Sequence, residues 1–162
     1  MQYRYMDSPL GQLLIAGDVK GLHFVGFPSG QLAVAPDVDW LHDEDICDEA
    51  VTQLAEYFAG ERQSFSLTLC PTGTEFQVAV LQALRQIPYG ATCSYGDVAR
   101  AIGRPKAVRA VGAANGRNPL PIIIPCHRVI GSNGSLTGFG GGLPAKQWLL
   151  AHEGRQAGLA GF

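Results

Sequence analysis

The residues of this 162-residue chain with the clearest chemical potential are Cys126, His127 and Arg128, which are consecutive. A thiolate is a strong nucleophile, and positive charge nearby lowers the pKa of a thiol. The grouping therefore predicts a nucleophilic cysteine assisted by a histidine base. The commoner meaning of a Cys-His pair is an inert buried cysteine beside a surface histidine, and Arg128 can equally pair with an acid. Neighbours on a strand face opposite ways, so Cys126 and His127 cooperate only where the chain turns or a water molecule bridges them.

The segment that leads to Cys126 is expected to be rigid and largely buried. Residues 122–124 are three isoleucines, which form a short apolar run. Three prolines, Pro119, Pro121 and Pro125, exclude a regular helix and argue against a central strand. A rigid lead-in suits a residue that must be held in one place.

A candidate third member of this site is Glu153, near the end of an expected helix. A carboxylate is unfavourable at a helix C-terminus, so Glu153 is either exposed and tolerated or held by a partner. His127 would be such a partner, because a carboxylate can orient an imidazole as it does in other nucleophile–base–acid triads.

The elements before residue 73 predict a small sheet with one helix. Apolar runs bounded by turn signals predict strands over 2–6, 12–16, 22–27 and 65–69. Apolar residues at helical spacing predict a helix over 46–58 that Gly60 can end. Residues 28–45 are rich in Pro, Gly and Asp and are expected to form a loop, and residues 70–73 a linker.

Beyond this linker the pattern becomes helical. Thr74 with Gln77, and Ser94 with Asp97, fit capping boxes at the starts of two helices. Pro105 suits the first turn of a further helix over 105–115. Pro144 suits the start of a last helix, which Gly154 can close.

Two short helices around Gly103 form a helix-turn-helix pattern, the second with a basic edge. Its basic residues are Lys106, Arg109 and Arg117, and its other residues are mostly small. Small side chains let a helix lie close to another helix, which is the commoner case. They also suit a helix that enters a DNA groove and contacts phosphates with Lys and Arg.

The net charge of −2 hides an asymmetry along the chain. Residues 1–75 hold three basic and twelve acidic residues, whereas residues 76–162 hold nine basic and two acidic ones. A basic half can attract a polyanion while the acidic half points away; two solvated faces of unlike sign are the simpler alternative.

No apolar run approaches the ~20 residues that span a bilayer, and no apolar signal region follows the N-terminus. We therefore expect a cytoplasmic protein without a membrane partner. The four cysteines lack the close spacing of zinc or redox sites and are expected to be separate thiols.

The segment Pro125-Cys126-His127-Arg128-Val129 resembles the active-site signature of the O6-alkylguanine-DNA alkyltransferases. Further motifs of that family occur in the same order and spacing, at 87–90, 94–96, 104–112, 118–119 and 148–154. The resemblance covers residues 74–154 closely. It is looser before residue 74, where 8–11 and 56–60 carry it.

The resemblance implies an α+β fold with two domains. Residues 1–72 would form an N-terminal ribonuclease-H-like α/β domain. Residues 73–162 would form a mainly helical domain of the winged helix-turn-helix kind, for DNA binding and alkyl acceptance. The implied function is direct repair of O6-alkylguanine, and possibly O4-alkylthymine, in DNA by irreversible, single-turnover transfer of the alkyl group to Cys126. The partner would be double-stranded DNA, bound through its minor groove by a monomer, with no cofactor. Some relatives hold zinc in the first domain, but no suitable ligand cluster occurs here, so no metal is expected.

The resemblance also implies roles for individual residues. Cys126 would accept the alkyl group, with His127 as a base acting through a water molecule and Glu153 orienting it. Asn118 would support the turn that carries Cys126. Tyr95 would contact the extruded guanine, and Arg109 would fill the gap that this base leaves. The other implied DNA-binding residues are Lys106, Ala107, Ala110, Gly112, Ser94 and Arg128. The implied substrate pocket consists of Tyr95, Phe139, Gly140 and Val129. Phe139 stands where the family has tyrosine, which removes a hydroxyl near the pocket but keeps the ring.

Three other functions fit parts of the sequence. A non-enzymatic lesion binder of this fold would lack Cys126. A helix-turn-helix regulator would bind one duplex sequence tightly and transfer nothing. A cysteine hydrolase would turn over an ester or a peptide, although such enzymes draw their histidine from a distant part of the chain.

Overall fold

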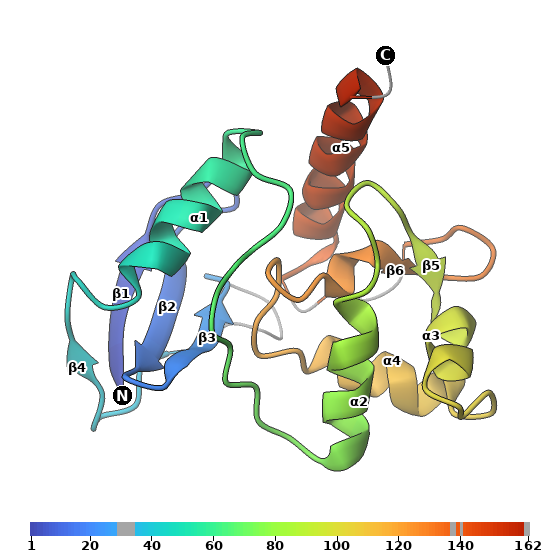
Figure 1. The fold of residues 1–162 in the computed structure, drawn as a ribbon, viewed down its shortest axis with the longest axis horizontal. Coiled ribbons are helices and arrows are strands. Elements are labelled where there is room, and N and C mark those ends of the chain that lie inside the picture. Colours follow the sequence, from blue (N-terminus) through green and yellow to red (C-terminus); the bar gives the residue numbers. More distant parts are fainter. Residues whose placement is uncertain (29–34, 137–138, 140, 161–162) are drawn as a thin grey trace.

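The N-terminal half, residues 1–72, holds a four-stranded sheet in the computed structural model, with one helix lying over it (Figure 1). The structure describes residues 1–28, 35–136, 139 and 141–160, with side chains only as far as residue 154 at the C-terminal end. The strand order is β3-β2-β1-β4, antiparallel except that β4 runs parallel to β1. The elements are β1 (Gln2–Met6), β2 (Leu13–Asp18), β3 (Gly21–Gly26), β4 (Leu41–His42) and α1 (Asp48–Phe58).

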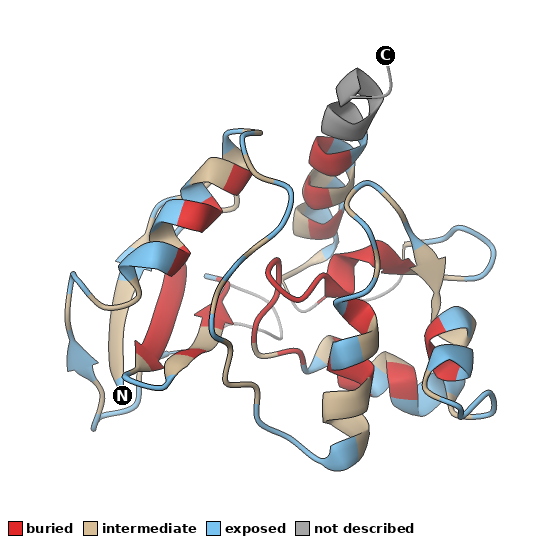
Figure 2. Cartoon of the chain, viewed as in Figure 1, coloured by how far each residue is buried: buried red, intermediate tan, exposed pale blue. Residues whose placement is uncertain are grey.

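The packing of this half follows from its apolar patterns. Strand β2 lies between its neighbours, and Leu13 to Ala16 are all buried, so both of its faces are covered (Figure 2). Helix α1 buries Ala50, Leu54 and Tyr57, which recur at helical spacing. The strand expected over 65–69 is wrong as a regular strand. This stretch pairs with β3 only at the single bridge Leu22–Leu69, flanked by two backbone hydrogen bonds.

The C-terminal half, from residue 73, is mainly helical. Its elements are α2 (Glu75–Leu84), β5 (Cys93–Ser94), α3 (Tyr95–Ala101), α4 (Val108–Gly116), the 3-10 helix η1 (Cys126–Arg128), β6 (Val129–Ile130) and α5 (Leu143–Ala160). Both expected capping boxes are confirmed, at Thr74 and at Ser94. Two expected boundaries are wrong, because α4 begins three residues after Pro105 and α5 continues through Gly154.

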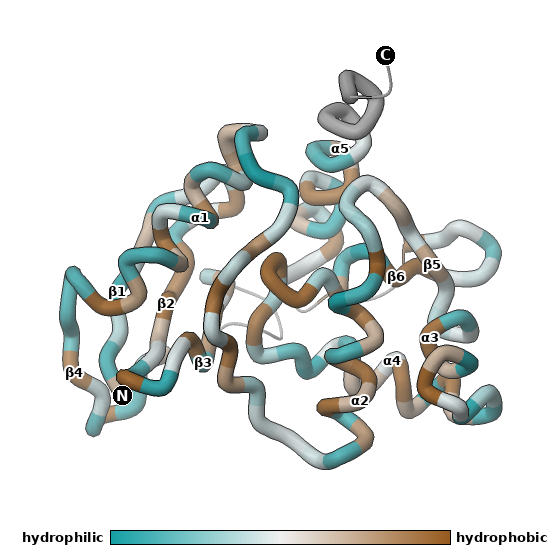
Figure 3. The backbone as a smooth tube through the Cα atoms, in the orientation of Figure 1, coloured by the Kyte–Doolittle hydropathy of each residue, from teal (hydrophilic) through white to brown (hydrophobic). Residues whose placement is uncertain are grey.

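The two halves share one hydrophobic core. Its buried residues come from the sheet, from α1 and from every helix of the C-terminal half, and include Ile15, Leu54, Leu81, Ile124 and Leu149. The Val25 N–H of β3 donates to the Pro119 carbonyl oxygen at 3.0 Å, which ties the sheet to the segment that leads to η1. That segment carries its hydrophobic run into the middle of the molecule (Figure 3). Both halves therefore position Cys126.

Candidate active site

Cys126 is the first residue of η1 and is 1% exposed, at the end of a tightly turned segment. Asn118, which is fully buried, closes this turn: its side-chain amide donates to the Ile124 carbonyl oxygen at 2.7 Å and accepts from the Leu120 N–H at 2.9 Å. Ile122 takes a left-handed conformation with φ of 75°, which is rare for a β-branched residue. Such a conformation persists only where the surroundings fix it, so the thiol is held on a rigid support.

Glu153 of α5 lies in the interior and accepts four hydrogen bonds. Its Oε2 accepts from His127 Nε2 at 2.7 Å, from the Tyr57 hydroxyl at 2.7 Å and from Arg128 Nη2 at 3.1 Å, and its Oε1 accepts from Arg128 Nε at 2.8 Å. Burial alone would raise the pKa of this carboxyl, but the hydrogen bonds of His127 and Arg128, with the charge of Arg128, hold it at about 2. Glu153 is therefore ionised at neutral pH and, of the two situations open to it, is held by partners.

The same contacts fix the state of His127. Its Nε2 faces an ionised carboxylate, so Nε2 carries the proton and Nδ1 presents a lone pair. Burial lowers the pKa of His127, against the opposing effect of Glu153, which favours the neutral ring. No described residue hydrogen-bonds Nδ1, which is buried. The imidazole is thus oriented and ready to accept a proton at Nδ1.

The expectation of a lowered thiol pKa at Cys126 is wrong for this state of the molecule. Burial raises the pKa of Cys126 to about 11, while hydrogen bonding from Asn118 and the charge of Lys146 lower it only in part. The physical reason is that the thiolate would have to form without solvent. Cys126 is therefore a neutral thiol at rest and would have to lose its proton to act as a nucleophile.

Lys146 of α5 is a charged residue near Cys126 that the motifs did not single out. Its side chain is fully buried and its Nζ donates to the Val129 carbonyl oxygen at 2.6 Å. Burial lowers the pKa of Lys146, and the neighbouring Cys126 opposes that shift. The sequence carries a signal for it, because the helical spacing of Lys146, Leu149 and Glu153 puts them on one face of α5. In the structure that face is buried.

Val129, an expected pocket residue, is itself fully buried beside Cys126 and pairs with Cys93.

Arg128 does not take the DNA-binding position that was expected of it. Its side chain is buried, forms an ion pair with Glu153 and donates from Nη1 to the Ile87 carbonyl oxygen at 2.7 Å. Its guanidinium also lies over the ring of Tyr89, 5.6 Å from the centroid. The structure therefore has the other arrangement open to Arg128, pairing with an acid, and this corrects its assignment to DNA.

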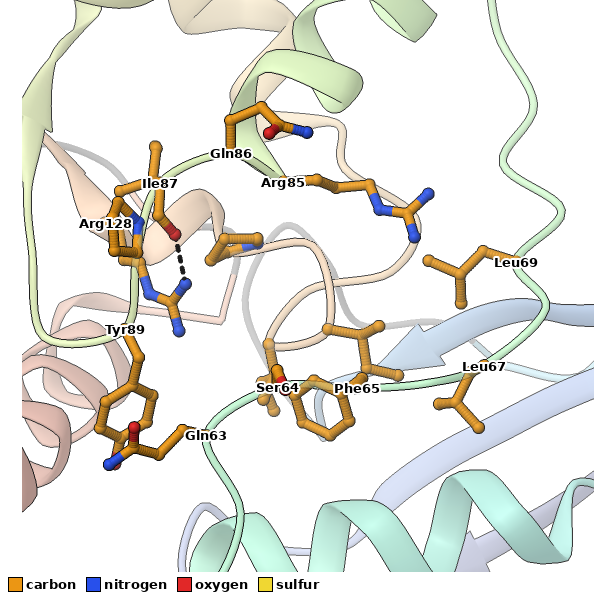
Figure 4. Close-up of a pocket in the computed structure, with 14 residues that line it drawn as sticks. Gln63, Ser64, Phe65, Leu67, Leu69, Arg85, Gln86, Ile87, Tyr89 and Arg128 are labelled. Atoms are coloured by element: carbon orange, nitrogen blue, oxygen red, sulfur yellow. Dashed lines mark hydrogen bonds between the residues drawn. The ribbon is translucent and has the colours of Figure 1, made fainter.

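A cavity of about 490 Å³ lies beside this ion pair (Figure 4). Its walls come from the segment around Phe65, from the end of α2 at Arg85 and Gln86, and from the segment before η1. The described residues that line it include Pro125 and Arg128 but not Cys126. This cavity is therefore not the expected alkyl pocket.

The other expected DNA-binding residues gather around α3 and α4. Lys106, Arg109 and Ala110 are exposed, and Ala107 is half-buried. Gly112 faces the ring of Tyr95: a Cβ at this glycine would lie 3.9 Å from the ring. Ser94 caps α3 by accepting from the Asp97 N–H, which gives it a structural role of its own. The helix-turn-helix thus presents a small, basic surface near Tyr95.

Phe139, an expected wall of the alkyl pocket, is 7% exposed. Its ring packs edge-on against Phe27, with centroids 5.6 Å apart, so the N-terminal half supports it. Gly140, the remaining expected pocket residue, lies outside the described residues.

Tyr57 is a further residue of the site that the sequence does not predict, because it lies in α1, 96 residues before the carboxylate that it contacts.

Two family models match this chain and together cover most of it. Residues 1–71 match the ribonuclease-like domain of 6-O-methylguanine DNA methyltransferase, and residues 75–155 match its DNA binding domain. The chain belongs to the 6-O-methylguanine DNA methyltransferase family. The family resemblance and the α+β fold with a ribonuclease-like and a helical DNA-binding domain are thereby confirmed.

Individual relatives agree with this 6-O-methylguanine DNA methyltransferase assignment. A methylated-DNA–protein-cysteine methyltransferase of Methanosarcina acetivorans is 52% identical over 95% of this chain and 99% of its own length. One from Mycobacterium leprae is 50% identical over 94% of this chain and 92% of its own. The crystal structure of Mycobacterium tuberculosis OGT in complex with DNA has a TM-score of 0.91 at 46% identity, covering 96% of this chain and 94% of that one.

Membership of the 6-O-methylguanine DNA methyltransferase family fixes the activity. The chain is a DNA-binding methylated-DNA–protein-cysteine methyltransferase that repairs O6-alkylguanine in DNA directly, as the sequence predicted. Among the described residues, no helix is long and apolar enough to cross a membrane. Nor do the described His, Cys, Asp and Glu side chains form a group of three or more that could hold a metal ion.

Proposed function

We propose that Cys126 receives the alkyl group and that His127, held by Glu153, takes up its thiol proton. The observation that carries the proposal is the buried pair of His127 Nε2 and Glu153 Oε2, 2.7 Å apart. This pairing leaves Nδ1 of His127 as the proton acceptor, and His127 directly follows Cys126 in the sequence. Because Glu153 is ionised and His127 neutral, the pair can accept one proton and keep it as an ion pair. One water molecule would carry the proton from Cys126 Sγ to Nδ1.

The transfer balances without a cofactor. Cys126 sulfur forms a bond to the alkyl carbon while the bond between that carbon and guanine O6 breaks. The electron pair of the broken bond stays on guanine, which takes up the proton that left the thiol and so becomes the normal base. His127 holds that proton only until it passes to guanine through water, and Lys146 supplies positive charge near the developing thiolate. The product is a thioether with no leaving group, so one protein molecule repairs one lesion.

The target atom lies inside the duplex, so the base must be extruded at a cost of a few kcal/mol. In the proposed complex Tyr95 contacts the extruded guanine and helps neutralise it as it leaves. Phe139 and Val129 border the alkyl group, together with Gly140. Arg109, exposed on α4, takes the place of the base in the stack and recovers part of the cost.

The bound DNA would lie along α4 with the protein as a monomer. Lys106 would contact phosphates, and Ala107, Ala110 and Gly112 would let the helix lie close in the minor groove. The small and exposed character of this face supports the proposal. We also propose the division into domains at 1–72 and 73–162, and O4-alkylthymine as a second substrate.

Mass spectrometry of the intact protein tests the acceptor assignment. After incubation with a duplex that contains O6-methylguanine, we expect one methyl group per protein molecule, located on the peptide that holds Cys126. Cys126→Ser should transfer nothing and still bind the duplex, because the thiol is buried and the exposed residues of α4 are unchanged. Repeated turnover, or a methyl group on Cys47, Cys70 or Cys93, would contradict the assignment.

A further inference from the structure

We propose that Tyr57, which belongs to the N-terminal half, is a positioning residue of the alkyl-transfer site and acts through Glu153 on His127. The inference rests on the proposed function, because it assigns Tyr57 to the same proton relay. It gives the ribonuclease-like half a direct part in the reaction, in addition to its part in the core.

The geometry places two donors on one oxygen. The Tyr57 hydroxyl and His127 Nε2 each lie 2.7 Å from Glu153 Oε2, and all three side chains are 0–1% exposed. An ionised carboxylate only accepts, so the phenol must donate. Burial, followed by the negative charge of Glu153, raises the pKa of Tyr57 far above its usual value, so it remains a donor throughout the working pH range.

Both the backbone and the ring of Tyr57 are held against α5. Its backbone carbonyl oxygen lies 2.8 Å from Nε2 of His152, the residue before Glu153. Its ring packs on the rings of Phe65 and His152, with centroids 5.7 and 5.3 Å away. The end of α1 is thereby locked to two consecutive residues of α5, and the hydroxyl cannot leave Oε2 without disturbing this packing.

The consequence for His127 follows from charge. A second hydrogen bond draws negative charge from Oε2, which weakens the hold of Glu153 on a protonated imidazole. The other ionisable groups around His127 are Arg128 and Lys146, which disfavour its protonation, and the neutral thiol of Cys126. Removing the Tyr57 hydroxyl should therefore raise the pKa of His127, and less neutral imidazole should be available to accept the thiol proton.

The experiment compares Tyr57→Phe with wild type in the rate of benzyl transfer from free O6-benzylguanine to Cys126, measured by intact mass between pH 5 and 9. This substrate needs no DNA binding. We expect a rate up to roughly tenfold lower in the acid part of this range, where the imidazole of the variant is protonated; this is the size of a lost hydrogen bond to a charged group. The acid limb of the pH–rate profile should also move to higher pH.

Tyr89→Phe is the matched control. The Tyr89 ring lies beside that of Tyr57, with centroids 6.2 Å apart, and its hydroxyl has no hydrogen-bond partner among the described residues. Removing it should leave the rate and the pH profile unchanged. The Tyr57→Phe effect should also disappear in a Glu153→Gln background, because a residue that acts through Glu153 has nothing to act on there.

An unchanged pH profile in Tyr57→Phe overturns the inference, whether or not the melting temperature falls, since a purely structural role lowers stability alone. An equal effect in the Glu153→Gln background also overturns it. Wild-type protein that transfers no methyl group to Cys126 from a duplex that contains O6-methylguanine would instead refute the proposed function, so the two failures can be told apart.

Discussion

The residues of the proposed relay comprise a neutral thiol, Cys126, and a charged carboxylate, Glu153. Glu153 is buried, yet four hydrogen bonds, two of them from its ion-pair partner Arg128, keep it ionised. At Cys126 the hydrogen bond from Asn118 and the charge of Lys146 offset burial only in part, so it remains a thiol. Removing one member of a buried charge pair leaves the other uncompensated, which is strongly destabilising. The arrangement therefore keeps the Cys126 sulfur uncharged in the absence of substrate.

The raised pKa of Cys126 predicts its reactivity in the absence of DNA. Below a pKa of about 11 the thiol holds its proton, so the fraction of thiolate still rises tenfold for each pH unit up to that value. Modification of the Cys126 peptide by a small alkylating reagent should therefore still be accelerating at pH 10. An ordinary thiol, with a pKa of about 8.5, would have levelled off. Peptide mass spectrometry across pH measures both, and a plateau near pH 8 would refute the burial argument.

Arg109 predicts a difference between two substrates. If it stands in for the extruded base, Arg109→Ala should slow repair in duplex DNA at least tenfold, equivalent to about 1.4 kcal/mol. Transfer from free O6-benzylguanine should hardly change, because no base leaves a stack. Because Arg109 is exposed, the melting temperature should not fall. Equal losses on both substrates would rule out this role.

The sequence revealed some site residues and concealed others for physical reasons. Cys126, His127 and Glu153 carry reactive groups within specific family motifs, so they could be proposed as site residues without a structure. Tyr57 could not, because only tertiary packing brings it to Glu153 from 96 residues away. The thiol pKa was misjudged because sequence shows neighbouring charges but not burial, and burial dominates at Cys126. Arg128 was assigned to DNA for the same reason.

The elements follow local signals wherever a side chain caps a backbone group. Both capping boxes, at Thr74 and Ser94, start their helices as predicted. Proline and glycine signals were less decisive. Pro105 fits a turn as well as a first helical turn, and the helix starts at Val108. Gly154 lies inside α5, since the burial of Leu149 and Glu153 outweighs the roughly 1 kcal/mol that a helical glycine costs.

The turn between α3 and α4 depends on Gly103, whose φ of 75° favours glycine. No atom lies within 4 Å of a Cβ added there, so Gly103→Ala tests the backbone alone. We expect a loss of about 1 kcal/mol in the free energy of unfolding. Gly154→Ala is the matched control, because it also meets open space but within a helix, and it should gain up to about 1 kcal/mol. Denaturant unfolding measures both, and equal signs would contradict the turn argument.

The whole molecule separates its charges as well as its elements. The basic residues are concentrated in the C-terminal half and the acidic residues in the N-terminal half, although both halves share one core. A lysine on the C-terminal half is therefore expected to contact DNA phosphates, whereas a lysine on the N-terminal half is not. Each phosphate contact releases counterions, so the logarithm of affinity falls with the logarithm of salt concentration by about 0.9 per contact on duplex DNA.

Two exposed lysines test this separation. Lys106 precedes α4, whereas Lys20 lies in the turn between β2 and β3. Lys106→Ala and Lys20→Ala remove the same charge, so a general effect of net charge would be equal in both. We expect Lys106→Ala to weaken binding to all duplexes alike and to reduce the salt slope by about one contact. Lys20→Ala should leave the slope unchanged in the same fluorescence anisotropy titrations. A slope that falls equally in both variants would show that long-range charge, and not a phosphate contact at α4, brings the protein to DNA.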